Sequence, residues 1–403
     1  MTSAAPPDWD EIRRQFKLDP TITNFALMAI ASNPKPVRRA IVRAHCGLNR
    51  NPLQFAVDNN PTNVTNVLDL VSRYFGLPPQ LIAFTQSTTM ALGQLLGGLC
   101  IRRGDEVLAS ENEHMATMEA LRLRERRDGT PHRTVRLFRD SASFTTEEIL
   151  TNLRAAVRPS TRVLALAWVY SSDGVKLPLG DIADFVKLEN STRTSRQDRL
   201  LLVVDGVHGF GVEDATLDQL GCDLFAAGCH KWLFGPRGTA VMCGTRDGWQ
   251  DVVPLLPGIA ASPDELGTRH ITAGLRAYEH FWALEQTFHF VMGIGKTAIA
   301  QRVHDLKARA HAGLARYAPR LAIHTPPSAS QSSGIIAFDI DGWDASQIVD
   351  ALRLRGFRLT ESSWDAARGG VHARLAISIL NSPNDVDRVV NEIGQLVASQ
   401  PPG

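Results

Sequence analysis

The chain has 403 residues, 44% of them hydrophobic, and its 43 basic side chains nearly balance 42 acidic ones. This length exceeds that of one small domain, and the near-zero net charge excludes a strong electrostatic footprint for nucleic acid or an acidic membrane. No apolar signal-peptide core follows the N-terminus, and no stretch reaches the ~20 uninterrupted apolar residues of a membrane helix. We therefore expect a cytoplasmic protein with neither nucleic acid nor membrane as a partner.

The cysteines give no sign of a disulfide framework or of a metal site. Their number is odd and no CxxC pair occurs among Cys46, Cys100, Cys222, Cys229 and Cys243. We assign no metal to the chain on this basis, and a reducing compartment fits the pattern.

Short β-rich runs alternate with helical segments through the middle of the chain. Several runs, such as VLALAWV and LLLVV, are almost continuously apolar, which is typical of strands covered on both faces. The expected strands are Leu81–Thr85, Glu106–Ser110, Arg133–Phe138, Arg162–Val169, Leu200–Val207, Leu224–Ala227 and Thr239–Cys243. The expected helices between them are Thr88–Leu99, Met115–Arg126, Thr146–Ala156 and Gly180–Leu188. This alternation predicts an α/β fold with a mostly parallel, seven-stranded sheet.

The pattern changes after about residue 272. Further on we expect a long helical stretch (Leu275–Leu314), followed by a strand (335–340) and a helix (Ala345–Arg355). A second strand (Arg374–Ile379) and a closing helix from Asn384 complete this region. The chain is therefore expected to have an N-terminal segment (1–55) that packs on both domains, a large domain (56–272) and a smaller α+β C-terminal domain (273–403).

Two segments combine an apolar strand with a charged residue near its end. LLVVDGVHGFG leads into Asp205, and GCHKWLFGPRG places Lys231 among aromatic residues and glycines. Ligands of open α/β sheets lie at the carboxyl ends of the strands. A lysine in apolar surroundings has a depressed pKa, which Schiff-base chemistry needs. For either segment alone, a turn aspartate or a surface lysine is the alternative.

Together these segments resemble the class V aminotransferase family of fold-type I enzymes, which depend on pyridoxal 5'-phosphate (PLP), in its isopenicillin-N-epimerase-like and cysteine-desulfurase-like branch. The resemblance covers nearly the whole chain. It implies that Lys231 carries PLP as a Schiff base and that Asp205 pairs with the pyridine nitrogen, which makes the ring an electron sink. It implies further that His114, in ENEHMAT, is a catalytic residue stacked on the ring, and that His208 lies near the ring hydroxyl.

The resemblance also indicates where the cofactor phosphate binds. Ser87, Thr88 and Thr89, in FTQSTTMAL, begin a helix, where free N–H groups and the helix dipole favour a phosphate. An ordinary N-cap is the alternative for these residues taken alone. His230 is expected near the phosphate, whereas Gly228 stands where many desulfurases have a serine, so one phosphate donor is missing.

Three further positions follow from the resemblance. Ser171, in VYSSDG, is expected at the ring hydroxyl or the substrate. Thr268, in LGTRH, is expected to reach the phosphate of a neighbouring subunit, which implies a homodimer. Arg374 takes the place of the arginine that clamps the substrate carboxylate, although Ala376 replaces a serine of that pattern.

Two departures separate the chain from its relatives. The loop LTESSWDAARGGVHAR, residues 359–374, lacks the cysteine nucleophile of desulfurases, so a cysteine desulfurase is not expected. Leu27 and Met28, in FALMAIASNPKPV, replace polar residues or glycine at the substrate entrance, which favours a bulky or partly apolar substrate. Asn51, in RNPLQF, is also expected to face the site.

These residues predict chemistry at Cα or Cβ of an amino acid. We favour a C–S lyase that acts by β-elimination on a cysteine-derived conjugate in specialised metabolism. The alternatives are an epimerase, then an aminotransferase or a decarboxylating deaminase. A non-catalytic PLP-binding scaffold or regulator is the alternative of another class.

Overall fold

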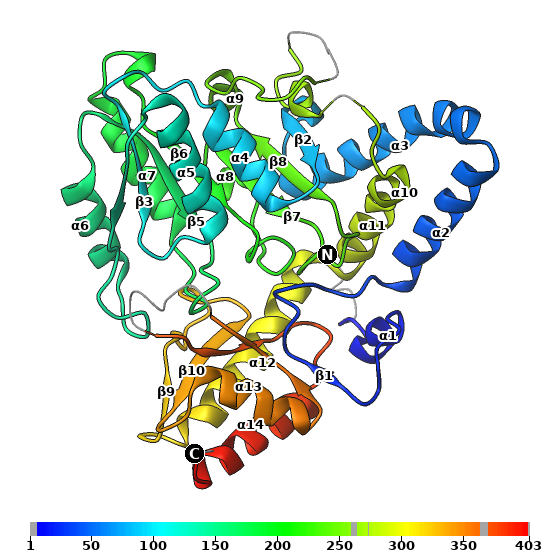
Figure 1. Cartoon of the computed structure of the whole chain (residues 1–403), viewed down its shortest axis with the longest axis vertical. Helices are drawn as coiled ribbons and strands as arrows, with labels where there is room; N and C mark the ends of the chain where they lie inside the picture. Colours follow the sequence, from blue (N-terminus) through cyan, green and yellow to red (C-terminus); the bar gives the residue numbers. More distant parts are fainter. Residues whose placement is uncertain (1–5, 259–263, 273, 363–369, 402–403) are drawn as a thin grey trace.

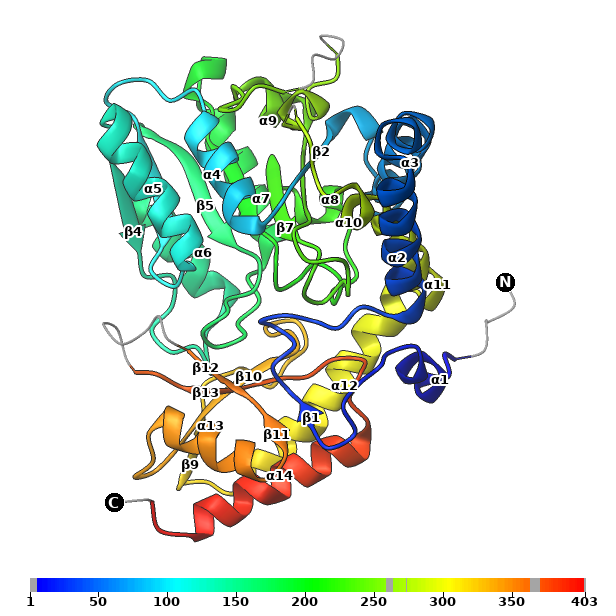
Figure 2. The ribbon, with the colours of Figure 1, turned by 45° about the vertical axis from the view of Figure 1, so that its right-hand side comes forward.

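The computed structural model describes residues 6–258, 264–272, 274–362 and 370–401. Figures 1 and 2 show a large α/β part and a smaller part beneath it, with the long helix α12 (Lys296–Ala315) running between them. None of the helices in these ranges has the length and apolar character needed to cross a lipid bilayer.

A seven-stranded sheet in the order β2–β8–β7–β6–β5–β3–β4 forms the centre of the large part. Neighbouring strands from β7 to β4 are parallel, and β8 runs antiparallel to both of its neighbours. The strand number and directions confirm the prediction of a mostly parallel seven-stranded sheet. The strands β3 and β5 to β8 are buried along their whole length, which explains their almost continuously apolar sequences. The strands are Ile82–Thr85 (β2), Glu106–Ser110 (β3), His132–Val135 (β4), Thr161–Ala167 (β5), Leu201–Asp205 (β6), Leu224–Gly228 (β7) and Ala240–Gly244 (β8).

Helices cover both faces of this sheet. α4 packs against α5 on one face, and α6 packs against α7 on the other (Figure 2). Right-handed crossovers require this arrangement, because the chain first steps from β2 through β3 to β4 and then returns through β5 and β6 to β7. The helices are Thr88–Gly98 (α4), Met115–Asp128 (α5), Thr146–Ala156 (α6), Leu179–Ser191 (α7), Leu217–Leu220 (α8) and Arg246–Gln250 (α9).

The N-terminal segment contains three helices and one short strand. Its strand pairs in parallel with β11 of the small part, and further along the Ala31 N–H donates to the His230 carbonyl of the large part at 2.9 Å. The next two helices form a hairpin that projects from the large part (Figure 1). The expected boundary after residue 55 falls inside the second of them. The elements are Trp9–Arg14 (α1), Thr23–Asn24 (β1), Lys35–Arg50 (α2) and Pro52–Phe75 (α3).

The small part has an antiparallel sheet in the order β12–β13–β10–β9. Alternate residues such as Ile336 and Phe338 join a hydrophobic cluster with α12 and α14, so Arg374, which pairs with Ala337, lies on the opposite face. That face is turned toward the large part. The elements are Leu321–Ile323 (β9), Ile335–Ile340 (β10), Ala345–Leu354 (α13), Phe357–Arg358 (β11), Thr360–Glu361 (β12), Ala373–Ala376 (β13) and Pro383–Ala398 (α14).

The expectation of one helical stretch over Leu275–Leu314 is wrong. Three helices occupy it, and the last two meet at Gly295, whose φ of +96° cannot continue a right-handed helix. These helices are Tyr278–Trp282 (α10), Leu284–Ile294 (α11) and Lys296–Ala315 (α12).

Candidate active site

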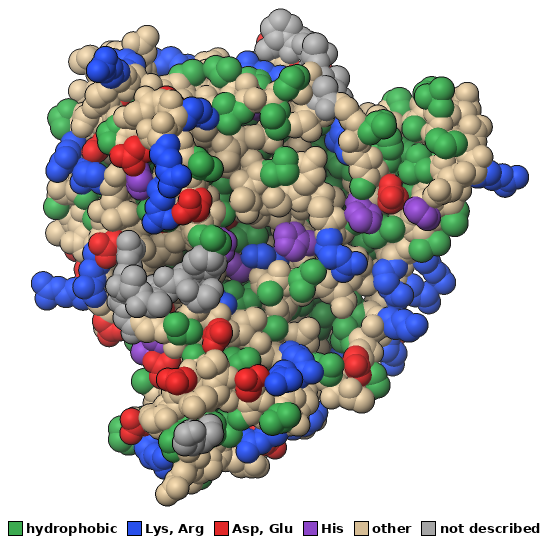
Figure 3. All heavy atoms as spheres, in the orientation of Figure 1, with side chains coloured by type: hydrophobic (Ala, Val, Ile, Leu, Met, Phe, Trp, Pro, Cys, Tyr) green, Lys and Arg blue, Asp and Glu red, His purple; other side chains and the backbone are tan. Residues whose placement is uncertain are grey.

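The predicted site residues follow the carboxyl ends of the parallel strands. Asp205 ends β6, His114 follows β3, Ser171 follows β5 and Lys231 follows β7. This edge of the sheet faces the small part, from which Arg374 on β13 donates a hydrogen bond to the Ser171 carbonyl. Figure 3 shows histidine and basic side chains gathered at the level where the two parts meet. The fold therefore brings together residues that are up to 260 positions apart in the sequence, from His114 to Arg374.

Lys231 and Asp205 alter each other's protonation. Burial lowers the pKa of Lys231 to about 8, assisted by the nearby Arg374 charge and opposed by Asp205. Burial raises the pKa of Asp205 to about 6, opposed by a 3.1 Å hydrogen bond from the Val207 N–H and by Lys231. A carboxylate and a readily deprotonated amine thus share one buried site.

Two histidines in this site are held in their neutral form. His208 is buried, and its Nδ1 lies 3.2 Å from Nε1 of Trp232, which is a donor only. Burial, with Lys231 and Arg374 nearby, holds the pKa of His208 well below 6.5. The Nδ1 of His114 accepts the Ala116 N–H at 3.1 Å at the start of α5, and burial lowers its pKa to about 4. Neither imidazole is therefore protonated to an imidazolium at neutral pH.

The first turn of α4 lies against the end of β7, and we call the groups that meet there the α4 cradle. Ser87 caps the helix, Thr88 is buried and Thr89 is exposed. A Cβ added at Gly228 would lie 2.8 Å from Thr88 Oγ1 and 3.0 Å from the His230 ring. The buried His230 Nδ1 has no hydrogen-bond partner in the described part of the chain. A hydroxyl, an imidazole and free helix N–H groups thus converge at this point.

Arg374 is buried on the face of the small sheet that is turned toward the large part. Its Nη1 donates to the Ser171 carbonyl and its Nη2 to the Glu361 carbonyl. The sequence prediction concerned the Ser171 side chain, whereas the described contact with Arg374 comes from the Ser171 backbone. These two carbonyls fix the plane of the guanidinium group, which favours bidentate recognition of a carboxylate.

The N-terminal segment lies against the lysine loop. Asn33 donates to the Phe234 and Gly235 carbonyls at 2.9 and 2.8 Å, three and four residues after Lys231. In the described chain, Phe234 is the non-glycine residue with positive φ (60°), so this bond supports a backbone conformation that side chains disfavour.

Leu27 and Met28 are both buried beside this contact. Leu27 lines a cavity of about 240 Å³ together with Ile30 and Ala31. The Thr360 hydroxyl donates to Met28 Sδ at 3.6 Å, and Thr360 pairs with Arg374 across the sheet. Met28 is therefore linked through Thr360 to the strand that carries Arg374.

Two predicted residues are not brought to this site within one chain. Asn51 is exposed at the junction of α2 and α3, and its side chain caps neither helix. Thr268 donates to Glu265 Oε2 at 2.9 Å in a short helical turn over Thr268–His270.

The sequence reasoning missed two residues that shape the site. Trp232 fixes the orientation of His208, and Glu113 lies buried behind Asp205. Glu113 Oε1 accepts from Ser110 Oγ at 2.7 Å and from the Ala167 N–H at 3.0 Å. Burial raises its pKa to about 8, opposed by these two hydrogen bonds and assisted by the Asp205 charge. An acid three residues after a fully buried strand was a readable signal for Glu113; no comparable signal pointed to Trp232.

These groups fit PLP. The amine of Lys231 can react with an aldehyde, Asp205 can accept from a protonated pyridine, and the α4 cradle with the unpartnered His230 Nδ1 suits a phosphate.

Comparison with known proteins agrees with this geometry. The aminotransferase class-V profile matches residues 29–389. The chain belongs to the class V aminotransferase family. Its cofactor is PLP, and its fold is that of fold-type I PLP enzymes.

The curated relatives include more than one activity. Isopenicillin N epimerase of Streptomyces clavuligerus is 26% identical over 414 residues, which cover 97% of this chain and 99% of the relative. A cysteine desulfurase of Haloferax volcanii is 23% identical, with 91% and 87% covered. The structure of a cystine C–S lyase with cysteine persulfide has a TM-score of 0.83 at 20% identity, covering 94% of this chain and 98% of that chain. This last likeness bears on the fold alone.

Proposed function

We propose that this chain is a PLP-dependent C–S lyase, which breaks the Cβ–S bond of a cysteine-derived conjugate by β-elimination in specialised metabolism. The observation that carries the proposal is the lowered pKa of Lys231, which makes its amine a base near neutral pH, beside two histidines that carry no proton to give as an imidazolium. The Lys231 pKa of about 8 lies near neutral pH, whereas the His114 pKa of about 4 and the still lower pKa of buried His208 leave both histidines neutral. Elimination needs a base that removes the proton from Cα. Epimerisation needs in addition an acid that returns a proton to Cα from the opposite face.

In this proposal each group has a defined task. Lys231 would hold PLP covalently, Asp205 would bind its ring nitrogen, His114 would stack on the ring, and His208 and Ser171 would lie near its hydroxyl. The cradle of Ser87, Thr88, Thr89 and His230 would bind the phosphate. Bound PLP supplies an electron sink for the bond that breaks at Cα.

The chain's own residues would then bind the substrate and move the proton. Arg374 would hold the α-carboxylate. Once the substrate amine has replaced Lys231 on the cofactor, Lys231 Nζ would take the proton from Cα, and the sulfur would leave Cβ with the bonding electrons and be protonated to the free thiol. Leu27 and Met28 would contact the substituent on sulfur, which favours a bulky or partly apolar conjugate. Hydrolysis of the eliminated product would give pyruvate and ammonia.

The test is a panel of S-substituted cysteines incubated with the PLP-loaded protein. We expect pyruvate and free thiol from at least one bulky conjugate, and neither from Lys231→Ala. Lys187→Ala is the matched control, because Lys187 is 73% exposed and its side chain contacts Asp184 within the described part of the chain. The absence of pyruvate and thiol from every conjugate would refute the lyase.

The same panel run in deuterated water separates the alternative functions. Epimerase activity is the second candidate, because two isopenicillin N epimerases match almost the whole chain at 26% and 25% identity. It would give deuterium at Cα with inverted configuration and no thiol. A non-catalytic scaffold would bind PLP at Lys231 and exchange no α-proton.

Cysteine itself belongs in the panel, since desulfurases stand among the relatives. Against desulfuration, burial raises the pKa of the Cys229 thiol to about 12, so this cysteine is a poor nucleophile. Release of alanine with transfer of sulfur would support a desulfurase instead.

The proposal includes a homodimer in which Thr268 reaches the phosphate site of the partner subunit, and it keeps Asn51 as a residue that faces a substrate. Exposed Val42, Leu53 and Val57 on the projecting α2–α3 hairpin support a covered surface there. Light scattering of the wild type and of Leu53→Asp tests the dimer, because a monomeric wild type would contradict it.

A cytoplasmic location also stays a prediction.

A further inference from the structure

Outside the PLP site, two histidines converge on one carboxylate in the small part. His324 Nε2 lies 2.7 Å from Asp339 Oδ2, and His372 Nδ1 lies 2.9 Å from both Asp339 oxygens. The two imidazole rings lie 4.0 Å apart, centre to centre, and are tilted by 31°. One ligand atom from each residue lies within 4.8 Å of the other two, and all three residues are half-buried.

The sheet register explains why residues 15 and 33 positions from Asp339 meet it. Phe338 pairs with Ile323 on β9 and with Ala373 on β13, so Asp339 stands opposite His372 and diagonal to His324. The three side chains share the face that carries Arg374. This sequence spacing matches no familiar metal motif, because the ligands come from three separate strand ends.

The large part packs against both sides of this cluster. Thr325, next to His324, donates to the Asp173 carbonyl, and Arg374, two residues after His372, donates to the Ser171 carbonyl. The cluster is thus held at the meeting of the two parts.

The donor set is the one that borderline divalent transition metals prefer. Two imidazole nitrogens and one carboxylate leave at least one coordination position open for water or another ligand. Ligand atoms in tetrahedral zinc sites, with bonds of ~2.0–2.1 Å, lie about 3.3 Å apart. The observed nitrogen–oxygen separations of 2.7 and 2.9 Å therefore need to open by only roughly half an ångström.

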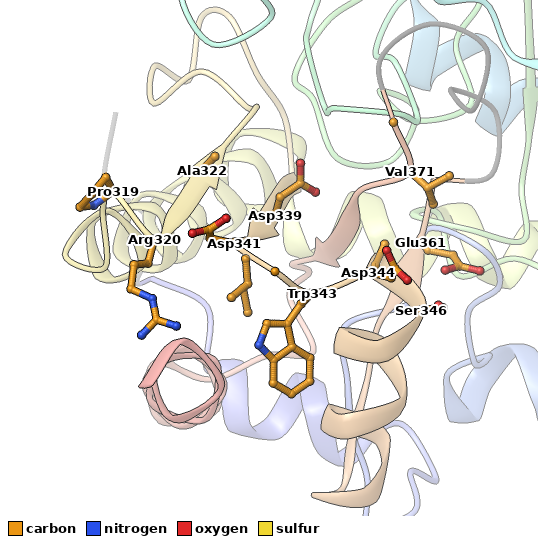
Figure 4. Close-up of a pocket in the computed structure, with 14 residues that line it drawn as sticks. Pro319, Arg320, Ala322, Asp339, Asp341, Trp343, Asp344, Ser346, Glu361 and Val371 are labelled. Carbon is orange, nitrogen blue, oxygen red and sulfur yellow. The ribbon is translucent and has the colours of Figure 1, made fainter. Parts of the chain in front are cut away.

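Solvent cations can reach Asp339 through a large acidic hollow. A cavity of about 890 Å³ borders Asp339 at the outer end of the small sheet (Figure 4). Its described lining has four acidic residues and one basic residue, namely Asp339, Asp341, Asp344, Glu361 and Arg320. A hollow with this balance of charge concentrates cations.

We propose that His324, Asp339 and His372 form a binding site for a divalent transition metal ion such as Zn²⁺ or Co²⁺. The site is distinct from the PLP site and does not depend on the proposed elimination. It lies on the same face as Arg374, so the bound ion would tie together three strands beside the substrate-binding region.

The test measures metal binding by tag-free, PLP-loaded protein after treatment with a chelator. Wild type should bind one equivalent of Zn²⁺ per chain, and Co²⁺ should add absorption bands at longer wavelength than the cofactor band. His324→Gln and Asp339→Asn should weaken binding by at least about tenfold, since even outer-shell changes cost 10–100-fold. His289→Gln, which alters a 55% exposed histidine on α11, should bind like wild type.

PLP absorbance and thermal unfolding establish that each variant is folded before metal is added. Two different ligand variants are used so that the test still works if one of them does not fold. No stoichiometric binding by wild type would overturn the proposal, leaving a hydrogen-bonded His–Asp–His network. Equal affinities in wild type and both ligand variants would overturn it as well.

Discussion

The lowered pKa of Lys231 sets the rate at which PLP-free protein should take up its cofactor. Only a neutral amine attacks an aldehyde. With a pKa of about 8 instead of 10.5, roughly 9% of Lys231 is neutral at pH 7 in place of ~0.03%, a difference of about 300-fold. The rate of covalent attachment should therefore rise roughly tenfold between pH 7 and 9 and level off above pH 9.

Rapid-mixing absorbance of PLP-free protein with excess PLP measures this rate at each pH. Asp205 opposes the lowering of the Lys231 pKa, so Asp205→Asn should move the midpoint about one unit lower. Lys187→Ala should leave the profile unchanged. A rate that still rises about tenfold between pH 8 and 9, where a pKa of about 8 allows only about a twofold rise, would show an ordinary lysine and refute the argument.

Three further predictions concern neighbouring residues. Arg374→Lys replaces the planar guanidinium group by an ammonium group, which cannot bind a carboxylate through two parallel hydrogen bonds. KM for amino-acid substrates should therefore rise by about thirtyfold, or ~2 kcal/mol, with a smaller change in kcat. Equal KM values would exclude Arg374 as the residue that binds the substrate carboxylate. Trp232→Phe removes a buried donor to His208, so urea denaturation should show a loss of about 1–2 kcal/mol; unchanged stability would mean that the 3.2 Å contact contributes nothing. Leu27→Asn should reduce selectivity for bulky conjugates in competition assays, and an unchanged substrate profile would contradict its role.

The central strands were predictable because each is buried on both faces and therefore almost continuously apolar. The prediction for Thr146–Ala156 coincides with α6, and that for Glu106–Ser110 coincides with β3. α2 and α3 escaped prediction because their prolines suggested breaks. Pro52, however, opens α3, where no N–H is needed, whereas Pro61 lies inside that helix.

In the site, Lys231 and Asp205 were recognisable because Asp205 is the last residue of a strand, Lys231 follows a strand, and each has a distinctive sequence neighbourhood. The hydrogen bond from Trp232 to His208 was not, since it joins two loops 24 residues apart. Likewise, the contact of Asn33 with the lysine loop depends on a separation of 201 residues, about which local patterns carry no information.

Gly228 shows why a residue-by-residue comparison can undercount the groups in a site. Its lack of a side chain removes the hydroxyl that many desulfurases place there. A Cβ at this position, however, would lie 2.8 Å from Thr88 Oγ1, so a hydroxyl from α4 already occupies the adjoining space. Because α4 packs on β7, a donor absent from one element is available from its neighbour. The glycine and the threonine therefore act as a pair, and a serine at 228 would crowd the cradle unless Thr88 moved.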